Sequence, residues 1–152
     1  MAAALRMLAA RSLSERQLRE RLLARPSADA AVIDNCIKRL KELGFIDDSL
    51  FARNYAGYRV KTKPMGRSRL ARELAGKKVS REEISGALDD VFDEVGEEAL
   101  IDRAIEKRIR THGRPLDRAG AKRMFDHLAR LGFAYDLILR KLRAVGSSEE
   151  EE

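Results

Sequence analysis

The apolar positions of the chain follow helical spacing and recur at intervals of about 50 residues. Five apolar residues between Leu70 and Leu88 are matched 54 positions later by five more, at Met124, Leu128, Phe133, Ile138 and Leu142. A shift of 52 positions in the other direction reaches Leu18 and Leu22. Recurrence at this period is typical of a small helical unit used in tandem. It favours an extended surface for a partner over a buried pocket for chemistry.

Breaking residues divide the chain into segments that each carry one apolar face, and none of them alternates as a half-buried strand does. The breaks fall at Pro26, Pro64, Gly96, Gly113 and Gly132. We expect nine helices, over 2–10, 15–25, 28–43, 49–62, 66–77, 81–92, 97–111, 117–131 and 135–145.

Helix-start signals agree with three of these segments. Ser14 with Gln17, and Ser80 with Glu83, have the spacing of capping boxes, in which each residue's side chain bonds the other's backbone N–H. Asp48 is expected to cap the helix that follows it.

The predicted fold class is all-α, built as three tandem three-helix repeats. The repeats are expected at 1–47, 48–94 and 95–145, followed by a disordered acidic tail at 146–152. A three-helix unit of this size buries too little surface to be secure alone, so packing against its neighbours is expected to contribute.

Composition suits thin helical units and narrows the class of protein. Charged residues make up 37% of the 152 positions, above the usual share of about a quarter. The single cysteine, Cys36, excludes an internal disulfide framework and fits the reducing cytoplasm. No run approaches the roughly 18 apolar residues of a membrane-spanning helix. We expect a cytoplasmic protein, most simply a monomer, with no membrane contact.

The net charge of +6 conceals a division into blocks. Residues 53–78 contain nine basic side chains and one acidic, residues 79–102 nine acidic and one basic, and residues 103–143 twelve basic and four acidic. Two basic blocks separated by an acidic one favour an anionic partner that is touched at more than one place. The alternative is that these charges only solvate helix faces.

The first basic block supplies the strongest candidate surface. Helix 66–77 is expected to turn its leucines inward and its cations outward, with free backbone N–H groups at its start that favour an anion. On the preceding helix, an aromatic stripe at Phe51, Tyr55 and Tyr58 is more typical of core than of a base-stacking platform. We assign a first basic patch to Arg67, Arg69, Arg72, Lys77 and Lys78.

Helix 117–131 repeats this arrangement in the third unit. We assign a second basic patch to Arg118, Lys122 and Arg123. Other cations of this unit lie near helix C-termini, where the helix dipole favours them without any partner. Because no set of base-reading side chains is visible, contact with nucleic acid is expected to involve the backbone and to weaken with salt.

Catalytic and metal chemistry find little support in the sequence. The histidines, His112 and His127, lack the spacing of metal ligands, and Cys36 lies on an apolar stripe. The acidic run from Asp89 to Glu98 has no binding loop and reads as a solvated helix end. There is no phosphate-binding glycine loop and no nucleophile–base pair. We expect no enzyme, cofactor or metal site.

Taken in order, several stretches resemble the RecX family of regulatory proteins over about residues 4 to 145. Each stretch alone is short and rich in apolar residues, and it is their order and spacing that is specific. They include Leu43-Gly44-Phe45-Ile46-Asp47-Asp48, then Gly66-Arg67 with Leu70, Glu73 and Leu74, then Val79-Ser80 with Ile84 and Leu88, and finally Leu131-Gly132-Phe133 with Asp136 and Ile138.

This resemblance implies an elongated, curved array of three-helix units that regulates the RecA recombinase. RecX-like proteins bind along the groove of RecA filaments on DNA and inhibit ATP hydrolysis, strand exchange and co-protease action, by blocking the groove or promoting filament loss. The expected partner is therefore the RecA filament on DNA, contacted by both basic patches. Weak direct binding to single- or double-stranded DNA stays open.

Two alternatives remain at this point. Three-helix units are also how helix-turn-helix modules are built, so the chain could regulate by binding duplex DNA without RecA. It could also be an adaptor whose partner is another protein, with no nucleic acid in the complex.

Overall fold

The computed structural model describes residues 1–147, and over that range the chain forms nine helices and no strand. This confirms the all-α fold class, and each predicted helix end lies within three residues of the observed one. The helices are α1 (Ala2–Ala10), α2 (Glu15–Leu23), α3 (Ala30–Glu42), α4 (Asp48–Thr62), α5 (Arg67–Gly76), α6 (Arg81–Val95), α7 (Glu97–His112), α8 (Arg118–Arg130) and α9 (Tyr135–Ser147).

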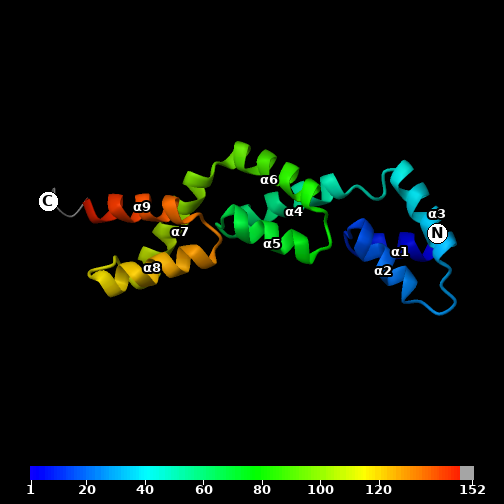
Figure 1. Cartoon of the computed structure of the whole chain (residues 1–152), viewed down its shortest axis with the longest axis horizontal. Coiled ribbons are helices and arrows are strands. Elements are labelled where there is room, and N and C mark those ends of the chain that lie inside the picture. Colours follow the sequence, from blue (N-terminus) through cyan, green and yellow to red (C-terminus); the bar gives the residue numbers. More distant parts are fainter. Residues whose placement is uncertain (148–152) are drawn as a thin grey trace.

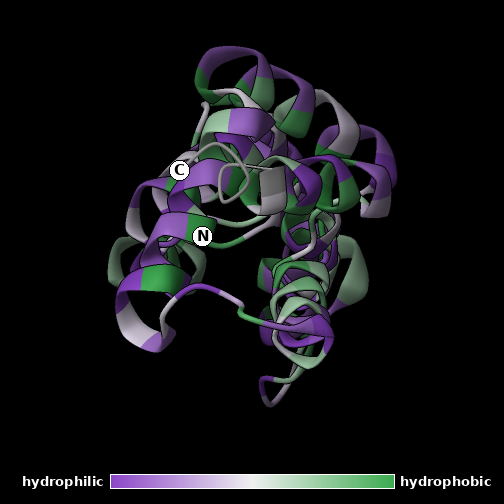
Figure 2. Ribbon diagram, turned by 90° about the vertical axis from the view of Figure 1, so that its left-hand side faces the viewer, coloured by the Kyte–Doolittle hydropathy of each residue, from purple (hydrophilic) through white to green (hydrophobic). Residues whose placement is uncertain are grey.

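The helices follow one another in groups of three along the long axis of the molecule (Figure 1). The N-terminus lies in the group at one end and the C-terminus at the opposite end, so the chain is an elongated array as predicted. Within the groups, α6 packs on α4 and α5, and α8 packs on α9. Hydrophilic and hydrophobic stretches alternate along the helices, which fits thin units that each turn one face inward (Figure 2).

The buried apolar side chains form two clusters. The first lies within residues 4–46 and includes Leu18, Ile37 and Leu40. The second runs from Ala52 to Ile138 and therefore joins the second and third helix groups in one core. The first group is thus packed on its own, whereas the other two share buried surface.

A backbone contact between two glycines locks the second and third groups together. The N–H of Gly66 donates to the carbonyl of Leu131 at 2.8 Å, and the N–H of Ser68 donates to the carbonyl of Gly132 at 3.3 Å. A Cβ on Gly66 would overlap the backbone of Gly132, and Gly132 has a φ of +92°, in the left-handed region that favours glycine. Only glycine allows the two segments to approach this closely.

Polar contacts join the first group to the second. Ser14 is fully buried, and its hydroxyl donates to the carbonyl of Lys77 at 2.6 Å while accepting from the N–H of Gln17. The predicted capping box at Ser14 is complete, because the side chain of Gln17 accepts from the N–H of Ser14.

The capping box predicted at Ser80 is only half formed. The hydroxyl of Ser80 accepts from the N–H of Glu83, which is one of the two hydrogen bonds that define the motif.

Asp48 does not cap α4 as predicted. The cap is Asp47, whose carboxylate accepts from the N–H of Leu50 at 3.1 Å, because the helix begins one residue earlier than expected. Asp48 instead reaches across to the start of α2 and accepts from the N–H of Glu15 at 2.9 Å. Burial at this junction raises the pKa of the Asp48 carboxyl above its usual value.

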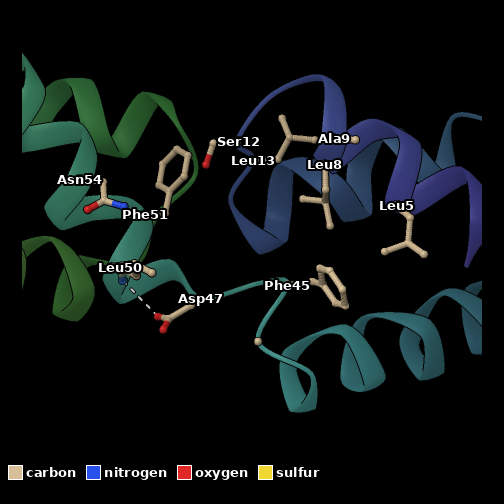
Figure 3. A pocket seen from close by; sticks show the side chains of 11 residues that line it. Leu5, Leu8, Ala9, Ser12, Leu13, Phe45, Asp47, Leu50, Phe51 and Asn54 are labelled. Carbon is tan, nitrogen blue, oxygen red and sulfur yellow. Dashed lines mark hydrogen bonds between the residues drawn. The ribbon is translucent and has the colours of Figure 1, made fainter.

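An apolar pocket of about 360 Å³ opens at the same junction. Leu5 and Leu8 of α1 face Phe45 across it, and Phe51 of α4 lies on the other side (Figure 3). Phe45, which belongs to the Gly-Phe-Ile-Asp-Asp stretch, is 56% exposed. Leu13 of the first cluster and Phe51, which packs on the second, both line the pocket, so it lies between the two clusters.

The C-terminal segment differs from expectation in one respect. Helix α9 continues through Gly146 to Ser147, so it includes the first two residues of the tail predicted at 146–152. The remaining tail residues, 148–152, lie outside the described residues.

Candidate interaction surface

Three of the five cations in the first basic patch are held by neighbours within the chain. The guanidinium of Arg67 lies 2.7 Å from the carboxylate of Asp89, and that of Arg69 lies 3.4 Å from Glu73. The ammonium of Lys77 lies 5.7 Å from the centre of the Tyr55 ring, within cation–π range. These three side chains have structural partners and present only part of their charge outward.

Arg72 and Lys78 are different, because both side chains are exposed and neither has an ion pair with any residue between 1 and 147. Arg72 lies on the outer face of α5. Lys78 lies in the turn after α5 with a φ of +66°, and the N–H of Val79 returns to the carbonyl of Leu74 to close that turn. These two residues are the free charges of the patch.

A carboxylate, Glu73, organises the inner side of α5. It accepts from Nε and Nη2 of Arg59, both at 3.0 Å, and from the hydroxyl of Tyr55 at 3.0 Å. Hydrogen bonding to Arg59 holds the pKa of the Glu73 carboxyl below its usual value, against the opposing effect of partial burial. Phe51 and Tyr55 of the aromatic stripe pack on the core as expected, whereas Tyr58 is 66% exposed.

We expect Glu73→Gln to lower the free energy of unfolding by about 1–2 kcal/mol, because hydrogen bonds to charged groups contribute more than neutral ones. The measurement is urea unfolding, with Glu42→Gln as the control. Glu42 pairs with Arg39 on the surface, where both side chains are more than half exposed, so its replacement is expected to change stability by less than about 0.5 kcal/mol.

The same variant should alter the acid limb of the stability curve. Because the Glu73 carboxyl is more acidic in the folded chain than in the unfolded one, its contribution is complete above its ordinary value of 4.5 and is lost as pH falls through the lower, folded pKa. The parent chain should therefore lose more stability than Glu73→Gln below about pH 4.5. Equal losses of stability in the parent chain and in Glu73→Gln as pH falls would contradict the lowered pKa assigned to Glu73.

Two N–H groups at the start of α5 are already engaged within the chain, which reduces what this helix start can offer to an anion. The N–H groups of Gly66 and Ser68 already donate to carbonyls of the segment after α8. Main-chain carbonyls of Leu131 and Gly132 accept these two bonds in place of an anion. Sequence reasoning could not detect this, because the partner carbonyls lie more than 60 residues away.

The cations of the second basic patch are not neutralised by any described residue. Arg118, Lys122 and Arg123 are exposed on α8, and none pairs with a carboxylate in the described part of the chain. Figure 1 shows α8 and α5 along the same long side of the array, with α6 along the opposite side. The structure therefore brings the helices of both predicted patches to one side, and places the helix that carries most of the acidic block on the other.

Part of the acidic block has a structural role that the sequence did not reveal. Glu98 at the start of α7 lies 2.7 Å from Arg140 and 3.5 Å from Lys141, and Asp102 lies 2.9 Å from Lys141. Hydrogen bonding to Asp102 raises the pKa of the Lys141 ammonium. These pairs tie α9 to α7.

Within residues 1–147, no three metal-binding side chains come together. No helix in this range is both long enough and apolar enough to cross a membrane.

Comparison with known proteins gives a consistent result. The family model described as "RecX, second three-helix domain" matches residues 47–88. "Regulatory protein RecX" from Treponema pallidum (strain Nichols) is 38% identical over 124 residues, which are 80% of this chain and 75% of that protein. "Regulatory protein RecX" from Halorhodospira halophila is 34% identical over 155 residues, covering 99% of this chain and 89% of that protein.

Solved structures agree on the fold. The crystal structure of RecX from Lactobacillus salivarius has a TM-score of 0.80 at 18% identity, over 95% of this chain and 93% of that chain. Another, described as the crystal structure of regulatory protein RecX, has a TM-score of 0.76 at 20% identity, over 90% of this chain and 66% of that one. From the sequence relatives together with this fold, the chain belongs to the RecX family of regulatory proteins.

Proposed function

We propose that this protein binds RecA filaments assembled on DNA and inhibits their ATP hydrolysis, strand exchange and co-protease action. It would thereby modulate DNA repair, recombination and the SOS response, from the cytoplasm and as a monomer without enzymatic activity of its own. Family membership supports a regulatory role related to RecA. The inhibitory mode is our proposal.

The observation that carries the proposal is the distribution of free cations. Arg72 and Lys78 on one helix group, and Arg118, Lys122 and Arg123 on the next, are exposed and form no ion pair with any residue from 1 to 147. A filament presents the same anionic features at regular intervals. An elongated chain with separated cationic patches can engage neighbouring subunits at once and gain affinity from the linkage.

All eight predicted cations are proposed to face the filament, five by direct contact and three in a supporting role. The five free side chains make direct contact. Arg67, Arg69 and Lys77, which are partly neutralised by neighbours, hold the shape of the first patch and add to its potential. The repeats at 1–47, 48–94 and 95–145 are proposed as the units that follow the filament.

The test is to add the purified chain to RecA on single-stranded DNA and to follow ATP hydrolysis over time. Inhibition well below one chain per RecA would indicate capping of filament ends, and a need for near-saturating amounts would indicate coating of the groove. Hydrolysis that is unaffected at every ratio would refute the proposal. Tight, sequence-selective binding to a duplex without RecA would instead identify a helix-turn-helix regulator.

A further inference from the structure

Two adjoining hollows lie on the third helix group and beside the segment before α5, and Arg123 is the one residue of the predicted patches that lines them. The first, of about 180 Å³, is enclosed by Lys63 and Pro64 before α5, by one face of α7, and by His127 of α8. The second, of about 410 Å³, lies between the end of α7 and the start of α8. Arg108 and His112 line both hollows, so the two adjoin at these side chains, and together they are called the cationic depression.

The charges around this depression are almost all of one sign. None of its arginine and lysine side chains has an ion pair with any residue that the structure describes. Asp117 is the single carboxylate among the lining residues, and its Oδ1 already accepts from the N–H of Gly120 at 2.7 Å. The lining cations and histidines are Lys63, Lys107, Arg108, His112, Arg114, Arg123 and His127.

Crowding of these groups is energetically unfavourable in the free protein. Partial burial, followed by the charges of Arg69, Lys107 and Arg59, lowers the pKa of the Lys63 ammonium. Like charges packed this closely without counter-charges raise the free energy of the folded chain. An anionic ligand in the depression would relieve that repulsion.

We propose that this depression binds the phosphodiester backbone of a nucleic-acid strand, one phosphate in each hollow. Two adjoining hollows that share Arg108 and His112 suit a ligand whose identical anionic groups repeat along one chain. Arginine and lysine hold phosphate oxygens by charge-assisted hydrogen bonds, and no base-reading side chain is needed. This deepens the proposed function, on which its biological use rests, but the binding itself requires no RecA.

Binding at this site should take up a proton. Burial, and then the charges of Arg108, Arg130, Lys63 and His112, lower the pKa of His127, so its ring is neutral near pH 7. Every charged group named here as acting on His127, from α7, from α8 and from the segment before α5, is basic. A bound phosphate would offset them and raise that pKa, so affinity should increase as pH falls.

The experiment measures binding of the full chain to a fluorescein-labelled oligothymidylate by anisotropy, without RecA. Lys107→Gln with Arg108→Gln is the test pair, chosen because neither residue belongs to the proposed filament patches. Arg21→Gln with Lys38→Gln is the control pair, since these exposed cations on α2 and α3 give the same change in net charge. A duplex of matched length forms a second arm.

The double substitution Lys107→Gln with Arg108→Gln should raise the dissociation constant roughly tenfold. It should also reduce the slope of log affinity against log salt concentration by about two. The control pair should change the dissociation constant less than about twofold. The nucleic acid whose affinity falls more in the test pair, the single strand or the duplex, is the one whose backbone binds in the depression. Equal losses for test and control pairs would overturn the proposal, because attraction would then be diffuse. Competition by polyglutamate as effective as by unlabelled strand would also overturn it, in favour of an acidic protein surface.

The pH dependence of binding is a second, independent measurement. Binding by the parent chain should strengthen between about pH 7.5 and about pH 5.5, and His127→Gln should flatten that dependence while leaving binding at the upper pH within about twofold. An unchanged pH profile in His127→Gln would show that the strand does not approach this residue, and would overturn the placement in the smaller hollow.

Discussion

Gly132→Ala is expected to lower the free energy of unfolding by about 3–5 kcal/mol, which would make it one of the most damaging single substitutions in the chain. The φ of +92° at this position costs a residue with a side chain about 1–2 kcal/mol. The added methyl group would also lie 2.6 Å from Cβ of Arg69 and would overlap its backbone. Relief requires the second and third helix groups to separate, with loss of the hydrogen bond from Gly66 to Leu131.

The measurement is equilibrium unfolding in urea followed by circular dichroism. Gly86→Ala is the matched control, because Gly86 lies inside α6 and a Cβ there meets nothing within 4 Å. The control should stabilise the chain by up to about 1 kcal/mol, as alanine is the better helix former. Equal effects of the two substitutions would show that the close approach at Gly132 does not hold the groups together.

Much of the fold could be predicted from the apolar pattern. Each helix buries one stripe, so the spacing of residues such as Leu70 and Leu74 predicts both the helix and its inner face. Breakers mark several of the ends, where Gly44, Gly96, Gly113 and Gly132 take a positive φ just after a helix. The family resemblance added the elongated arrangement, which periodicity alone does not specify.

Most of the parts that sequence reasoning missed depend on contacts between distant segments. The carbonyls that accept from Gly66 and Ser68, the bond from Asp48 to α2 and the three bonds from Arg59 and Tyr55 to Glu73 join residues with no shared periodicity. The pairing of Arg69 with Glu73 is an exception, because its i, i+4 spacing on one helix is visible in the sequence and could have distinguished Arg69 from Arg72. The blocks of like charge were visible, but their neutralisation depends on the tertiary structure.

The cationic depression is another feature whose residues are visible in the sequence but whose grouping depends on the tertiary structure. Lys107, Arg108 and the two histidines were visible as basic residues, and the histidines were set aside because their spacing does not suit a metal. Folding brings His112 and His127 from different helices to the same hollow, together with Lys63 from a third segment. A helical wheel of any one of these segments cannot show the group.

Reversing the free cations of both patches is expected to have the largest functional effect. In the variant Arg72→Glu, Lys78→Glu, Arg118→Glu and Lys122→Glu, attraction to an anionic filament surface becomes repulsion at four of the five free cations, and Arg123 is kept because it also lines the cationic depression. Because linked contacts reinforce each other, losing both patches should raise the concentration needed for inhibition on the order of 100-fold, more than either pair of reversals alone. All four side chains are exposed, so the fold should be retained.

The most direct test of the account is therefore ATP hydrolysis by RecA on single-stranded DNA, titrated with this four-site variant at several salt concentrations. The control variant reverses four exposed cations of the first helix group, Arg6, Arg21, Arg25 and Lys38, for the same change in net charge. The account predicts that the control inhibits like the parent chain while the patch variant leaves hydrolysis nearly unimpeded. Inhibition by the patch variant at the parent's concentration would contradict it.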